Sequence, residues 1–130
     1  MITLDSSAAQ RTVATMKTRL RQDRRFDDRH PGTGLVATAE GEEFEVLDIS
    51  IGGMKIPLPA GRRTWKGQVI EFQMRSTRWP DMRIASGRGE VRFVSGDWVA
   101  LQFVRPSYDL MKCVSRHVAS LIWGDQPYGY

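Results

Sequence analysis

Hydrophobic and polar positions alternate with a period of two through the middle of the chain. In the stretch EFEVLD, Phe44 and Val46 share one face and Glu43 and Glu45 the other. Such alternation is typical of a strand with one buried face. The six strands that it predicts cover residues 35–39, 43–48, 54–58, 68–75, 90–94 and 98–103.

No helical pattern separates these strands. The last two are divided by Ser95, Gly96 and Asp97, a sequence that favours a tight hairpin turn. Short strands with one apolar face must close or stack to bury that face. The sequence therefore predicts a mainly β fold, a six-stranded antiparallel β-barrel.

Both ends of the chain show a helical period instead. After Pro106 an apolar stripe recurs with a period of about 3.6, and Gly124 is placed to end the helix. The stripe consists of Leu110, Val114, Val118, Leu121 and Ile122. His117 is predicted on the polar side of this helix. We expect the stripe to pack on the barrel as a plug or lid, or against a second copy of the chain.

At the amino terminus Val13, Met16 and Leu20 have helical spacing, which predicts a short amphipathic helix or arm. The expected organisation is an arm at 1–20, a barrel with an arginine-rich loop at 21–105, and a helix and tail at 106–130.

Composition narrows the class of protein. A chain of 130 residues with 41% hydrophobic content can bury one core, so we expect a single domain. It contains no apolar run of about 18 residues and no apolar signal-peptide core near the start, which predicts a cytoplasmic location. The single cysteine, Cys113, cannot form an internal disulfide, and we expect it to serve in packing.

Candidate catalytic groups are scarce. His30 and His117 are not at metal-ligand spacing with other ligand residues, and Ser50 lacks the flanking glycines of a nucleophile elbow. No glycine-rich phosphate loop is present. We therefore expect no enzymatic activity, no catalytic residue, no metal and no cofactor.

Charge is segregated along the chain, with a net charge of +4. Five arginines fall within eleven residues: Arg19, Arg21, Arg24, Arg25 and Arg29. A guanidinium group can bind phosphate through two parallel hydrogen bonds and can stack on a purine. The cluster is thus a candidate nucleotide site, although taken on its own a solvated basic arm explains it better.

The second candidate is the stretch DISIGG, where an acid, a hydroxyl and two glycines interrupt a strand pattern. Asp48 and Ser50 could accept hydrogen bonds from the donor edge of a guanine. Gly52 and Gly53 would allow a positive φ or the close approach of a planar ligand. A hairpin turn is the alternative.

Together these motifs resemble the signature of PilZ domains, bacterial receptors for cyclic di-GMP. The family pattern is Arg-x-x-x-Arg ahead of the first strand, then Asp/Asn-x-Ser-x-x-Gly within a six-stranded β-barrel. RFDDR ends at Arg29, and DISIGG begins nineteen positions later at Asp48. The resemblance covers residues 21–104. The Arg-x-x-x-Arg pattern also matches from Arg21 to Arg25, but this match has a longer separation from the second motif.

The resemblance implies a role for each matching residue. Arg25 and Arg29 would bind phosphates and stack on guanine, while Asp48 and Ser50 would hydrogen-bond the guanine. Gly53, with Gly52 beside it, would keep the strand surface clear for the ligand.

The resemblance also bears on stoichiometry. Arg24 would favour an intercalated pair of cyclic di-GMP molecules, and Arg21 could add a phosphate contact. Asp27 and Asp28 would oppose binding if they faced the phosphates.

The implied function is that of a cyclic di-GMP receptor or adaptor. The arginine arm would fold over the barrel on binding, and an unidentified downstream protein in motility, exopolysaccharide or cell-cycle control would read the new surface. We expect a monomer or homodimer without a membrane span. The alternatives are a PilZ-like protein-interaction module that does not bind the nucleotide, and a small barrel that binds single-stranded nucleic acid.

Overall fold

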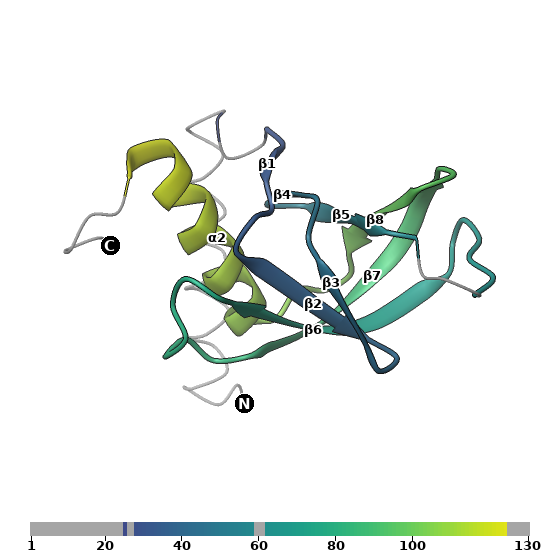
Figure 1. Cartoon of the computed structure of the whole chain (residues 1–130), viewed down its shortest axis with the longest axis horizontal. Helices are drawn as coiled ribbons and strands as arrows, with labels where there is room; N and C mark the ends of the chain where they lie inside the picture. Colours follow the sequence, from purple (N-terminus) through teal and green to yellow (C-terminus); the bar gives the residue numbers. More distant parts are fainter. Residues whose placement is uncertain (1–24, 26–27, 59–61, 125–130) are drawn as a thin grey trace, which may run out of the picture.

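The computed structural model describes residues 25, 28–58 and 62–124, which form one curled antiparallel sheet and one helix (Figure 1). The strands are β1 (His30–Pro31), β2 (Leu35–Ala39), β3 (Glu42–Glu45), β4 (Asp48–Ser50), β5 (Gly53–Pro57), β6 (Val69–Ser76), β7 (Ala85–Val94) and β8 (Trp98–Phe103). Their order across the sheet is β1-β4-β5-β8-β7-β6-β2-β3. The helix is α2 (Tyr108–Trp123).

The mainly β, antiparallel prediction is confirmed, but the predicted number of strands is wrong. The described part of the chain has eight strands, and the sheet curls into a half-barrel. The two strands that periodicity missed are β1, with two residues, and β4, with three. Strands this short show too little alternation to be recognised. The predicted helix or arm at 1–20 lies outside the described residues.

The segment predicted as one strand at 43–48 is divided because it changes partner. The Val46 amide donates to the Leu35 carbonyl on β2, while the next amide, of Leu47, donates to the Lys55 carbonyl on β5. The chain thus crosses from one side of the half-barrel to the other between β3 and β4. This crossing places Asp48 beside β5.

Alternation predicts the buried face well on the long strands. Ile70, Phe72 and Met74 of β6 are buried, as are Val99, Leu101 and Phe103 of β8. The exception is on β7, where Val91 is buried but Phe93 is 57% exposed. A register shift against β8 between these two residues inserts an extra residue and turns Phe93 outward.

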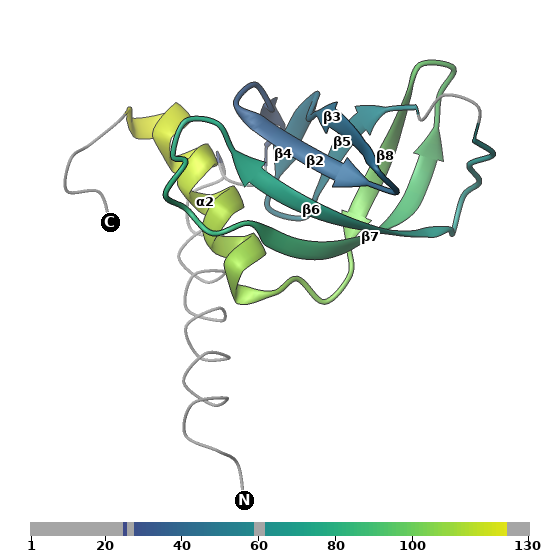
Figure 2. The same ribbon diagram turned by 60° about the horizontal axis from the view of Figure 1, so that its bottom comes forward.

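Helix α2 packs against the sheet at one end of the half-barrel (Figure 2), which confirms the predicted plug. The Ser107 side chain accepts from the Leu110 amide at 3.1 Å, and Gly124 ends the helix with φ of 81°, as expected. Two side-chain predictions on this helix are wrong. Leu121 is 43% exposed, and His117 is fully buried rather than on the polar side.

Cys113 belongs to the core between helix and sheet, so its predicted packing role is confirmed. Burial raises the pKa of its thiol to about 11, although nearby Arg116 lowers it in part. At pH 8 roughly one thiol in a thousand is then ionised.

We expect Ellman's reagent to leave Cys113 unmodified in the folded protein at pH 8, followed by absorbance at 412 nm, because burial suppresses both access and ionisation. In urea above the unfolding transition, one thiol per chain should react within minutes. Full reaction at the same rate without urea would contradict the packing of α2.

Within these described ranges, no helix has the length and apolar character needed to cross a membrane.

Candidate functional site

Asp48 lies at the centre of a charged cluster on the outer face of β1, β4 and β5. In the sheet register it stands directly opposite Pro31 on one side and Lys55 on the other. Residues directly opposite in antiparallel strands carry their side chains on the same face. Arg29 precedes Pro31 by two residues and therefore shares this face.

Each oxygen of the Asp48 carboxylate has its own cation. Arg29 Nη1 is 3.0 Å from Oδ1, and Lys55 Nζ is 3.4 Å from Oδ2. The Arg29, Lys55 and Asp48 side chains are 46%, 31% and 21% exposed. Exposed ion pairs of this kind contribute at most about 1 kcal/mol to stability. The cluster can therefore exchange partners at little cost to the fold.

The turn after Asp48 gives its two glycines different surroundings. A Cβ placed on Gly53 would stand 2.1 Å from the Leu101 carbonyl oxygen, whereas Gly52 has no described atom within 4 Å of that position. Neither glycine has a positive φ, so the conformational reason suggested from the sequence is wrong. The close approach at Gly53 is to the backbone of β8.

Ser50, the other polar residue of the motif, is buried beside the same turn. Its hydroxyl donates to the Gly53 carbonyl across 3.4 Å, near the upper limit for a hydrogen bond. A bond this long can be exchanged for a better acceptor or donor.

The remaining predicted arginines are placed only in part. Arg21 and Arg24 lie outside the described residues, as does Asp27. Arg25 is exposed, and its carbonyl accepts a hydrogen bond from the His30 ring, which connects the arginine loop to β1.

Lys55 was missed by sequence reasoning, although a signal for it was present. If Ile51 and Gly52 form a two-residue turn, counting outward pairs Asp48 with Lys55, as the structure does. The Lys55 ammonium also lies 4.2 Å from the Trp98 ring, which stacks on Phe93 with centroids 5.5 Å apart. This cation–π contact holds the ammonium beside Asp48.

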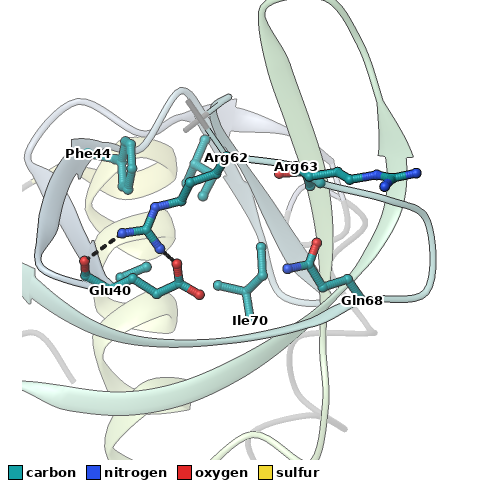
Figure 3. Close-up of a pocket in the computed structure, with 9 residues that line it drawn as sticks. Glu40, Phe44, Arg62, Arg63, Gln68 and Ile70 are labelled. Atoms are coloured by element: carbon teal, nitrogen blue, oxygen red, sulfur yellow. Dashed lines mark hydrogen bonds and ion pairs between the residues drawn. The ribbon is translucent and has the colours of Figure 1, made fainter. Parts of the chain in front are cut away.

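The described cavities lie elsewhere. One, of about 250 Å³, opens near the β2–β3 turn, where the Arg62 guanidinium pairs with Glu40 and Arg63 points away (Figure 3). Its lining residues are Ala39, Glu40, Phe44, Ile56, Arg62, Arg63, Thr64, Gln68 and Ile70. None of the predicted nucleotide-binding residues is among them. The cluster around Asp48 lies on a partly exposed sheet face outside these cavities.

In the part of the chain that the structure describes, no three His, Cys, Asp or Glu side chains gather in an arrangement that could hold a metal ion.

No protein-family model and no curated protein matches the sequence. Solved structures do resemble the fold. An uncharacterised Legionella protein, Lpg0364, superposes with a TM-score of 0.53 at 16% identity, covering 69% of this chain and 92% of that protein. YcgR from Escherichia coli in complex with c-di-GMP gives 0.56 at 16% identity, covering 73% of this chain and 44% of YcgR.

The motility inhibitor MotI/DgrA from Bacillus subtilis gives a TM-score of 0.49 at 18% identity, over 65% of this chain and 46% of that one. The chain thus spans less than half of YcgR and of MotI/DgrA. YcgR is a PilZ-domain protein. The chain has a PilZ-like fold.

Proposed function

We propose that the protein is a cyclic di-GMP receptor or adaptor that changes conformation on binding and signals to a partner protein. The observation that carries this proposal is the meeting of Arg29, Asp48 and Lys55 on one exposed face of a PilZ-like fold. The structural neighbour YcgR was solved in complex with c-di-GMP.

Binding would exchange the partner of Arg29. In the structure its guanidinium pairs with Asp48 Oδ1 at 3.0 Å. A phosphate offers the same guanidinium two parallel charge-assisted hydrogen bonds. Lys55 would stay on Oδ2, so that Asp48 remains neutralised while Oδ1 accepts from the N–H donors of a guanine.

The other motif residues would complete the site. Arg25 would supply a second guanidinium, and the Ser50 hydroxyl would turn from the Gly53 carbonyl to the guanine. Arg21 and Arg24 would contact phosphates, with Arg24 favouring a second, intercalated nucleotide. Gly52 and Gly53 would leave the strand surface low beneath the base.

The output of such a receptor is a new surface, because release of Arg29 from Asp48 alters the exposed face of β1 and β4. The proposal involves no catalysis. A protein of motility, exopolysaccharide synthesis or cell-cycle control would read this surface.

One observation favours an alternative, an interaction module that does not bind the nucleotide. Phe93 is largely exposed on the outer face and stacks on Trp98, with Val94 exposed beside it. Exposed aromatic and aliphatic side chains of this kind are enriched in the centres of protein interfaces. This module would dock its partner through the β7–β8 hairpin without cyclic di-GMP.

Calorimetric titration separates these functions. We expect cyclic di-GMP to bind the wild-type protein with two molecules per chain, and cyclic di-AMP to bind far more weakly, because adenine offers an acceptor where guanine offers the N1–H donor that Asp48 needs.

No heat with cyclic di-GMP at tens of micromolar would exclude the receptor and leave the interaction module. One nucleotide per chain would remove the role given to Arg24. Binding of an oligonucleotide with steep salt dependence, without cyclic di-GMP binding, would favour a nucleic-acid-binding barrel.

A further inference from the structure

The carbonyl of Pro31 faces away from the sheet. Gly32 donates to the Leu47 carbonyl at 3.2 Å, and the β1–β4 register continues with Pro31 opposite Asp48. Hydrogen-bonded and non-hydrogen-bonded pairs alternate along antiparallel strands, so Pro31 and Asp48 form a non-hydrogen-bonded pair. Because β1 is an edge strand, the Pro31 carbonyl has no further strand to bond.

His117 of α2 provides the donor for this carbonyl. Its Nε2 lies 2.9 Å from the Pro31 oxygen, and the ring is fully buried. Since a carbonyl only accepts, Nε2 carries the hydrogen, and Nδ1 is the unprotonated nitrogen of the neutral ring. Among the described residues, Nδ1 has no hydrogen-bond partner.

The backbone of His117 is also held by hydrogen bonds from the β6–β7 connection. Arg78 Nη1 donates to Ser120 Oγ at 2.8 Å, and Ser120 Oγ donates to the His117 carbonyl at 2.7 Å. The β6–β7 connection thus holds this turn of α2, while the imidazole ring extends to β1. Figure 1 shows α2 and β1 side by side at the same end of the half-barrel.

Among the described residues, few backbone hydrogen bonds hold β1. It consists of two residues, and one of them is a proline without an N–H. The hydrogen bond from His117 is therefore one of its attachments, together with the pairing to β4 and the contact of the His30 ring with the Arg25 carbonyl. Arg29 comes directly before this strand, so the position of its guanidinium relative to Asp48 depends on β1.

We propose that His117 is a positioning residue for the candidate nucleotide site: from α2 it fixes β1 and with it Arg29, so that helix docking and nucleotide binding are coupled. The ligand in this coupling is the one given by the proposed function. The coupling itself rests on the hydrogen bond between His117 and the Pro31 carbonyl. By linkage, a nucleotide that requires β1 in place strengthens the docking of α2 by the same factor.

The ring also makes this coupling sensitive to pH. Burial lowers the pKa of His117, and the charges of Arg78 on the β6–β7 connection and His30 on β1 lower it further, against the opposing effect of the Pro31 carbonyl. Because the folded-state pKa is below the ordinary 6.5, folding and docking are favoured above pH 6.5 and weaken as the pH falls below it. Protonation would bury a charge and an unpaired Nδ1–H.

The test compares His117→Leu, His117→Gln and, as a matched helix variant, Ser115→Ala, whose hydroxyl bonds only within α2 to the Lys112 carbonyl among the described contacts. We expect the leucine variant to bind cyclic di-GMP about tenfold more weakly at pH 7.5. Glutamine can donate to Pro31 without titrating, so its affinity should stay within about threefold of wild type.

The same three variants are then titrated at pH 6.0 and 5.5. The wild type and Ser115→Ala should weaken by a larger factor than His117→Gln, because only the first two carry the titrating ring. Equal affinity of His117→Leu and wild type, or an identical pH profile in His117→Gln, would overturn the proposal. The pH profile of His117→Gln tests the proposal even where His117→Leu does not fold.

Hydrogen exchange provides a measurement that needs no nucleotide. The Gly32 amide, bonded to Leu47 at the end of β1, should exchange about tenfold faster in His117→Leu than in wild type or Ser115→Ala. Unchanged exchange overturns the coupling whether or not cyclic di-GMP binds. Faster exchange in a protein that binds no nucleotide supports the helix contact and rejects only the receptor function.

Discussion

Replacing Gly53 with alanine should lower the free energy of unfolding by about 2 to 4 kcal/mol. The added Cβ would lie 2.1 Å from the Leu101 carbonyl oxygen and 3.3 Å from the Gln102 Cα, so its neighbours are backbone atoms that no rotamer change can move. Gly53 and Gln102 are paired in the ladder between β5 and β8. The substitution must therefore separate two central strands.

The adjacent glycine supplies the control. Gly52→Ala adds its Cβ where no described atom lies within 4 Å, and Gly52 does not have a positive φ. Its unfolding free energy should change by less than about 1 kcal/mol, with a gain possible from the reduced entropy of the unfolded chain. Urea unfolding followed by tryptophan fluorescence measures both. Equal midpoints for the two variants would contradict the close contact of Gly53 with β8.

This pair of variants also bears on why the motif contains glycine. The resemblance to PilZ domains implies that Gly53 clears the strand surface for a ligand, whereas its contact with Leu101 is a requirement of the sheet itself. In Gly53→Ala any loss of affinity comes with a disturbed sheet, so Gly52→Ala, which leaves the sheet undisturbed, is the variant that tests whether this turn must stay clear for a ligand.

The fold was predictable where a strand is long enough to repeat its pattern. Ile70, Phe72 and Met74 show the buried face of β6 in the sequence itself, and the structure buries all three. β4 could not be found in this way, because the chain around it changes partner from β2 to β5 within two residues. Alternation puts Phe93 on the same face as Val91, which is wrong because a bulge depends on the register between two strands, and the pattern of one strand does not show it.

The candidate site was predictable only in its motif residues. The proximity of Arg29 and Asp48 came from the resemblance alone, since a separation of nineteen positions along the chain fixes no distance in space. Lys55 could have been found by counting residue pairs outward from the turn at Ile51 and Gly52, which places it opposite Asp48. His117 could not, because its burial depends on how α2 meets the edge of the sheet at Pro31. Contacts within a hairpin are encoded locally, whereas contacts between a helix and an edge strand are set by the tertiary fold.

Arg29→Ala should weaken cyclic di-GMP binding by about tenfold to a hundredfold, because each charge-assisted contact contributes about 1.5 to 3 kcal/mol. The matched control is Arg75→Ala. Arg75 is 42% exposed, like Arg29, and its guanidinium pairs with Glu43 at 3.3 Å on the β2–β3 side of the sheet. Both variants remove one positive charge and one exposed ion pair, so each should keep its unfolding free energy within about 1 kcal/mol of wild type.

Calorimetry in the same buffer at two salt concentrations distinguishes a contact from general attraction. Loss of overall positive charge lowers the affinity of both variants alike, and this effect becomes smaller as the salt concentration rises. Loss of a phosphate contact lowers the affinity of Arg29→Ala alone, and the loss remains at the higher salt concentration. Equal affinities of the two variants would remove Arg29 from the site. The measured loss is also a lower bound on the phosphate contact, because wild-type Arg29 must first leave Asp48, while the alanine variant has no such pair to break.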